Sequence, residues 1–105
     1  MAVSTRKEQI EAMLADEPND PLLRYMLAMD HVSVKDDARA VDCFRDLLAR
    51  AADYVPAYMQ IGQALCRLGR IDDARDVWQC GIVQARQQAN DHAAGEMQGM
   101  VEGLE

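Results

Sequence analysis

The side chains in this chain that could do chemistry begin with two histidines, His31 and His92, and three cysteines. The cysteines are Cys43, Cys66 and Cys80, and no two of them form a CxxC pair. A zinc site needs three or four such groups that converge on one point, and this spacing gives no reason to expect convergence. We therefore predict no metal site. An odd number of unpaired thiols favours a reducing compartment, which we take to be the cytoplasm.

Two pairs of adjacent carboxylates, Asp36–Asp37 and Asp72–Asp73, are the other candidates for chemistry. Both pairs stand where a helix is expected to begin, and there capping and a favourable interaction with the helix dipole explain them. General acid–base catalysis would need a desolvated cleft that separates their two pKa values. The chain also has no glycine-rich phosphate loop and no nucleophile elbow. We predict a non-catalytic protein without a cofactor.

Length and composition limit what can position these side chains. The chain has 105 residues, enough for one domain, and half of them are apolar. Seven methionines and only five aromatic side chains favour helices over strands. The net charge of −7 argues against nucleic acid and anionic membranes as partners. No apolar run approaches the length of a membrane span.

Side-chain sizes recur along the chain at an interval of 34 residues, which is typical of a repeat protein. The shift places small residues on small ones and large residues on large ones: Leu27 on Ile61, Ala28 on Gly62, Ala40 on Ala74, Phe44 on Trp78 and Leu48 on Ile82. The literal match "DDAR", at 36–39 and 72–75, has an interval of 36 and would pair Phe44 with Cys80. We attribute that match to two similar helix starts.

The repeated unit is predicted to be a pair of helices. Pro21, with Asp20 as its N-cap, opens the first helix, and the second runs from about 37 to 51. Pro56 opens the next pair, and Gly69 suits the left-handed residue after its first helix. Residues 4–15 match the second helix of an incomplete preceding unit. Residues 90–105 match loosely, and their glycines weaken a helix.

These patterns predict an all-α protein of five or six helices, in which successive hairpins stack on one another. Helices approach closely only where neither carries a bulky side chain at the crossing. We therefore expect Ala28 to face Ala40 in one hairpin, and Gly62 to face Ala74 in the next.

The unit resembles the tetratricopeptide repeat. Residues 55–88 carry its pattern well, with the "LGR" turn and with Tyr58, Ile61, Gly62, Leu65, Ala74, Trp78 and Gly81. Residues 21–54 carry it less closely, with Leu27, Ala28, His31, Ala40, Phe44 and Leu47. The resemblance implies a right-handed α-solenoid. It divides the single domain into a leading half-repeat helix (1–20), two repeats (21–54 and 55–88) and a C-terminal capping helix (89–105).

The same resemblance implies a concave face that binds protein. Its lining would be Leu22, Tyr25, Met29, Val32 and Ser33 from one helix, and Pro56, Met59, Gln63, Cys66 and Arg67 from another. Flexible thioethers and a tyrosine suit an apolar helix or peptide segment. The alternative is that the terminal helices fold over this surface and turn it into ordinary core. His31 is expected to pack where the repeat usually has a tyrosine, and Met13 and Met26 are expected in the core.

Grooves of this family that clamp a terminal carboxylate use lysine, asparagine and arginine. Here Tyr25, Met29, Met59 and Gln63 stand at such places, and Arg67 is the only cation on the predicted face. A carboxylate clamp, and with it binding of heat-shock chaperone tails, is therefore disfavoured.

The leading hypothesis is a protein–protein interaction module with an apolar concave groove. The alternative is self-association, as a homodimer or an assembly scaffold, through the groove or the terminal helix. That helix carries Met97, Met100, Val101 and Leu104, which could seek a partner.

Overall fold

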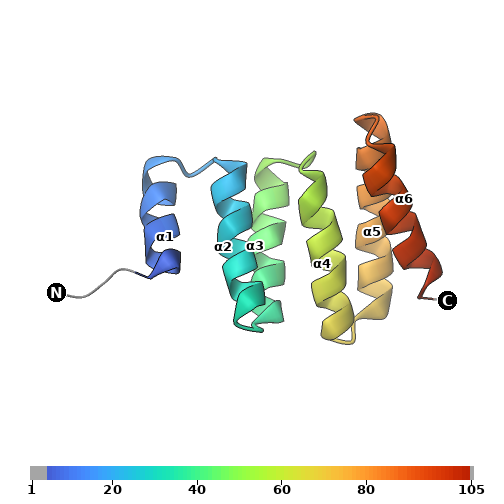
Figure 1. Cartoon of the computed structure of the whole chain (residues 1–105), viewed down its shortest axis with the longest axis horizontal. Coiled ribbons are helices and arrows are strands. Elements are labelled where there is room, and N and C mark those ends of the chain that lie inside the picture. Colours follow the sequence, from blue (N-terminus) through green and yellow to red (C-terminus); the bar gives the residue numbers. More distant parts are fainter. Residues whose placement is uncertain (1–4, 105) are drawn as a thin grey trace.

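The structure is a computed structural model that describes residues 5–104. It consists of six helices in a row: α1 (Arg6–Asp16), α2 (Pro21–Ser33), α3 (Asp37–Arg50), α4 (Val55–Arg67), α5 (Ile71–Gln87) and α6 (Asp91–Glu102). Each helix packs against the next along the chain, so the molecule is elongated and measures 52 × 29 × 20 Å (Figure 1). The predicted all-α helical-repeat solenoid is confirmed.

The interval of 34 residues fixes where four helices begin. Pro21 and Val55 open α2 and α4, and Asp37 and Ile71 open α3 and α5. Asp20 caps α2 as predicted, because its Oδ1 accepts the backbone N–H groups of the two residues that follow Pro21, at 2.9 and 3.2 Å.

The core follows the inner faces of α3, α4 and α5 and continues onto α6. Its largest fully buried members are Phe44, Leu47, Ile61, Leu65 and Met97. Burying side chains of this size removes a large apolar area from water, which holds the successive helices together. Within the described residues 5–104, no helix combines the length and the apolar character needed to cross a membrane.

At the contact between α4 and α5, the group that packs against Gly62 is the indole of Trp78. A Cβ at Gly62 would lie 2.0 Å from Trp78 Nε1, so only glycine leaves room for the ring. The indole N–H donates to the Met59 carbonyl at 3.2 Å. The three atoms nearest to that Cβ all belong to the Trp78 ring, and the absent side chain leaves room for the indole N–H to reach the backbone. Ala74, which we expected to face Gly62, is fully buried in the same core.

Three turns share one backbone geometry, in which the second residue after the helix end has a positive φ. These are the turns after α2, α4 and α5, with Lys35 at φ 63°, Gly69 at 78° and Ala89 at 56°. In each, the next backbone N–H donates to a carbonyl of the last helical turn: Asp36 to His31, Arg70 to Leu65 and Asn90 to Ala85, at 2.8–2.9 Å. This is a Schellman end. The prediction for Gly69 is confirmed, whereas lysine and alanine hold the same conformation at a steric cost.

Helix α6 departs from the 34-residue interval. It begins 36 residues after α4, because α5 has 17 residues where α3 has 14, and a three-residue turn (88–90) replaces the four residues 51–54. At this interval the buried side chains correspond: Ala93, Ala94, Met97 and Val101 fall on Ala57, Tyr58, Ile61 and Leu65. The loose match at an interval of 34 reflects this offset, and α6 is continuous despite its glycines.

Helix α1 is the least buried of the six, and Ile10 is its one buried residue. Met13 is 55% exposed, so the prediction that it belongs to the core is wrong. Helix α1 packs mainly against α2, so the side of α1 that faces away from α2 stays exposed. Met26, on α2, is half-buried.

Candidate functional site

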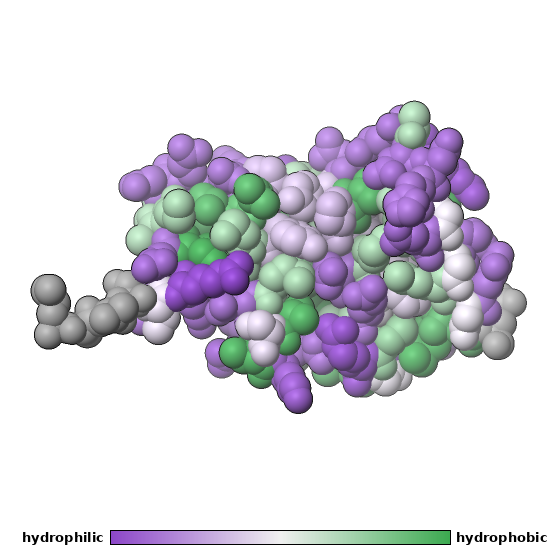
Figure 2. Space-filling view, in the orientation of Figure 1, coloured by the Kyte–Doolittle hydropathy of each residue, from purple (hydrophilic) through white to green (hydrophobic). Residues whose placement is uncertain are grey.

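The ten residues predicted to line the groove all lie on α2 or α4, and none is fully buried. Ser33 and Pro56 are exposed. Leu22 and Arg67 are exposed, and Tyr25, Met29, Val32, Met59, Gln63 and Cys66 are half-buried. The terminal helices therefore do not turn this surface into core. Figure 2 shows apolar side chains gathered over the α1–α2 end of the molecule and again further along the same face.

Tyr25 is held in place by two other rings. Its centroid lies 5.7 Å from that of Phe44 and 5.6 Å from that of Tyr54, both in tilted arrangements. Tilted aromatic pairs at these distances are favourable beyond the area that they bury. Burial raises the pKa of Tyr54, and the nearby Tyr25 raises it further. The Tyr54 phenol therefore stays neutral at physiological pH, so the ring that supports Tyr25 carries no charge.

The middle of the predicted groove surface is held in place by contacts with the core. Met59 offers its carbonyl to the Trp78 indole, and Met29, Val32, Met59 and Cys66 all pack in part against the core. Each of these side chains keeps some exposure, so flexible thioether groups stand on a firm backbone.

The cation on this surface already has a partner. Arg67 Nη2 lies 2.9 Å from Asp37 Oδ1, and its Nε donates to the same oxygen at 3.0 Å. This ion pair ties the end of α4 to the start of α3. Capturing a ligand carboxylate with Arg67 would require breaking it, which agrees with the unfavourable view of a carboxylate clamp.

The structure shows that α6 corresponds to α4, a relation that sequence reasoning missed. At the interval of 36 residues, His92 corresponds to Pro56, Gly95 to Met59, Gly99 to Gln63 and Glu102 to Cys66. All four are exposed, and no atom lies within 4 Å of a Cβ built on Gly95 or Gly99. The sequence signal was available: Met97 and Val101 align with buried residues only when the interval is lengthened by two.

The cysteines and histidines do not form a reactive centre. Burial raises the pKa of the Cys43 thiol, and the carboxylates of Asp46 and Asp42 raise it further, so it remains protonated at neutral pH. Among residues 5–104, no three His, Cys, Asp or Glu side chains gather as a metal ion would need. His31 is buried, as expected. His92 is exposed and contacts Glu96 one turn along α6.

The four residues suggested for self-association do not form one exposed patch. Met97 and Val101 are buried against the protein's own core, and Met100 and Leu104 are half-buried beside it. The idea that Met97 and Val101 seek a partner is therefore wrong, because α5 already covers that side of α6.

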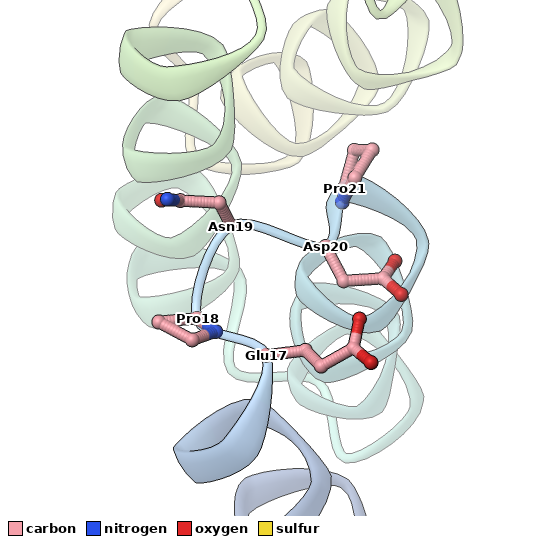
Figure 3. Close-up of a pocket in the computed structure, with 5 residues that line it drawn as sticks. All are labelled: Glu17, Pro18, Asn19, Asp20 and Pro21. Atoms are coloured by element: carbon pink, nitrogen blue, oxygen red, sulfur yellow. The ribbon is translucent and has the colours of Figure 1, made fainter.

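Two hollows lie at the α1–α2 connection rather than on the predicted groove. The larger, about 540 Å³, is lined by residues 17–21, and Glu17 and Asp20 point to the same side of the loop (Figure 3). The other, about 270 Å³, adds Met13, Asp16 and Leu23. Neither hollow is lined by a residue predicted for the groove.

Two solved structures resemble this chain in both sequence and fold. A solution structure of a tetratricopeptide repeat domain protein from Salinibacter ruber is 35% identical over 84% of this chain and 89% of that one, with a TM-score of 0.79. A crystal structure of such a protein from the same organism is 34% identical over 81% and 94%, with a TM-score of 0.75.

A third structure extends the likeness over nearly the whole chain. The solution structure of a protein from Bordetella parapertussis is 25% identical over 97% of this chain and 89% of that one, with a TM-score of 0.84. No protein-family model and no curated protein sequence matches the chain. The two Salinibacter ruber matches, with more than a third of positions identical and most of both chains covered, are sufficient: this chain belongs to the tetratricopeptide repeat family.

Proposed function

We propose that this protein is a non-catalytic interaction module that binds a helix or an extended segment of another protein across α2 and α4. Its membership of the tetratricopeptide repeat family suggests a protein-interaction module. One observation supports the finer proposal: α2 and α4 both carry apolar side chains that are partly exposed and pack in part against the core. These side chains are Tyr25, Met29, Val32, Met59 and Cys66, and Leu22 on α2 is exposed.

We propose the same division of the chain that the repeat pattern implies. Residues 1–20 provide a half-repeat, 21–54 and 55–88 are full repeats, and 89–105 close the array. In this arrangement the groove is short, because only two full repeats contribute the helices that line it. Specific binding then depends on a few buried anchors.

The free energy of binding would come mainly from apolar area removed from water, at about 25 cal/mol per Å². A short groove with a few anchor side chains falls at the small end of protein interfaces. We expect a dissociation constant nearer micromolar than nanomolar.

The test is to place a charge on the groove. Met29→Lys and Met59→Lys should each abolish binding of an identified partner, because a desolvated ammonium group costs more than the contact supplies. The partner is first isolated from the native cells and identified, and its purified binding segment is then titrated by calorimetry.

Val83→Lys is the matched control, since Val83 is an apolar residue of α5 that is 53% exposed and lies outside the groove. Circular dichroism should show unchanged helicity in all three variants. Partner affinity that survives both methionine substitutions, or that falls equally in Val83→Lys, would refute the groove.

A further inference from the structure

We propose that the groove continues from α2 and α4 onto α6, and that its occupant is a partner segment carrying apolar side chains together with Lys or Arg. This inference rests on the proposed function and names the chemistry of the partner. The outward side of α6 has the same relation to the core as the groove sides of α2 and α4. The side chains on this surface change from apolar on α2 to acidic on α6.

The relation between α4 and α6 follows from burial. Four buried residues of α6 correspond to four buried residues of α4 at an interval of 36, and the two helices therefore turn corresponding faces outward. Glu102 takes the place of Cys66 on that face. Glu96 lies at the adjoining place, which Gln60 fills on α4. Both glutamates are exposed, so the groove face of α6 offers carboxylates where α2 offers methionine and valine.

On α6 itself, His92 contacts Glu96 and Gln98 Nε2 donates to Glu102 Oε1 at 3.4 Å. No lysine or arginine of the groove-forming helices pairs with either carboxylate. Of the eleven Lys and Arg residues, only Arg24 and Arg67 lie on α2, α4 or α6. Arg67 is paired with Asp37 at 2.9 Å. Arg24 donates to the Pro18 carbonyl at 2.6 Å and lies 3.9 Å from Asp46. Both arginines thus point to neighbouring elements and are engaged there.

The space beside the carboxylates is open. Gly95 and Gly99 correspond to Met59 and Gln63, and nothing lies within 4 Å of a Cβ built on either. Figure 2 shows hydrophilic side chains at the upper end of α6 and apolar ones over the α1–α2 end. A long cationic side chain can lay its methylene groups along bare backbone while its charged end reaches a carboxylate. An acidic segment would meet like charge instead.

The probes are two helical peptides of identical length with leucine at every third and fourth position. The remaining positions carry lysine in one peptide and glutamate in its twin. Binding is measured by fluorescence anisotropy at low and high salt. We expect the lysine peptide to bind and the glutamate peptide to bind far more weakly. We also expect high salt to lower the affinity of the lysine peptide.

The decisive variant removes the two carboxylates without changing side-chain shape. Glu96→Gln combined with Glu102→Gln should weaken the lysine peptide about three- to tenfold at low salt, since each exposed ion pair contributes modestly. Asp42→Asn combined with Asp76→Asn is the control. Asp42 and Asp76 are exposed, lie on α3 and α5 outside the groove, and are 34 residues apart. Their double substitution removes the same amount of charge as the glutamate variant does. The control should change affinity less than twofold.

Different outcomes separate this inference from the groove itself. If both peptides bind equally and Met59→Lys abolishes both, the groove stands and its preference for cations is wrong. If the control weakens binding as much as the glutamate variant does, net charge explains the affinity and the inference fails. Binding of neither peptide, or lysine-peptide binding that survives Met59→Lys, would overturn both proposals. A dimer that Met59→Lys converts to monomer would make a second copy the occupant.

Discussion

Glycines occur inside helices both at the α4–α5 crossing and along α6, but their surroundings differ. A Cβ at Gly62 would lie 2.0 Å from the Trp78 indole, and one at Gly81 would lie 2.6 Å from Met97 Sδ and from Tyr58 Cβ. On α6, a Cβ at Gly95 or Gly99 would meet no atom within 4 Å. The same residue type therefore permits close packing in the first region and leaves a face of the helix bare in the second.

The contrast shows that glycine, a weak helix former, has different structural roles in the two regions. At the crossing, glycine is required because two helices and a large ring share the space. On α6, nothing in the packing requires it, so the helix carries an unfavourable intrinsic propensity that packing of its other face must offset. Substitutions at the crossing and on α6 test this contrast, and a substitution on α1 gives the smallest expected effect.

The largest effect is expected at the crossing. Gly62→Ala should lower the free energy of unfolding by about 2–3 kcal/mol, because the new methyl group must displace an indole that is buried and hydrogen-bonded. Urea denaturation followed by circular dichroism measures the change.

The cause can be isolated by repeating Gly62→Ala in a Trp78→Leu background. If the indole is what the methyl group displaces, the cost should largely disappear there. An equal cost in both backgrounds would mean that the ring is not responsible.

An effect of opposite sign is expected on α6. Gly95→Ala should raise the free energy of unfolding by up to about 1 kcal/mol, and Gly99→Ala should do the same, because alanine is the better helix former and the added methyl group has room. The same denaturation measurement applies. Destabilisation by either substitution would show that these glycines are packed, and the contrast would be lost.

The smallest effect is expected on α1. Met13→Ser should change the free energy of unfolding by less than about 0.5 kcal/mol, since most of that side chain is already in water. Ile10→Ala on the same helix is the control and should destabilise measurably, because Ile10 is buried. Similar losses from both would mean that α1 packs more fully than its burial indicates.

Much of this fold could be predicted from the sequence, because size matching at 34 residues reports directly on how helices nest. That interval separates the starts of α2 and α4 and of α3 and α5, and capping chemistry indicated the Asp20 cap and the turn at Gly69. It could not place α6, since three additional residues in α5 and a shorter turn shift the register by two. Nor could it foresee Lys35 and Ala89 at positive φ, because neither residue type indicates that conformation.

The site was harder to predict than the fold. The groove residues on α2 and α4 were proposed from the family pattern, and the structure leaves all ten partly or fully exposed. Side-chain contacts that decide their behaviour, such as Arg67 with Asp37 and Tyr25 with two rings, join residues distant in sequence. The α6 face was missed because its glycines were interpreted only as helix-weakening residues.

The register shift at α6 also matters to anyone who wishes to lengthen this array. A further hairpin grafted onto α6 by strict 34-residue counting would begin two residues too early. Its first helix would then be rotated by more than half a turn, turning polar positions toward the core. Engineered extensions should therefore count from Asp91, the first residue of α6, and not from the units that precede it.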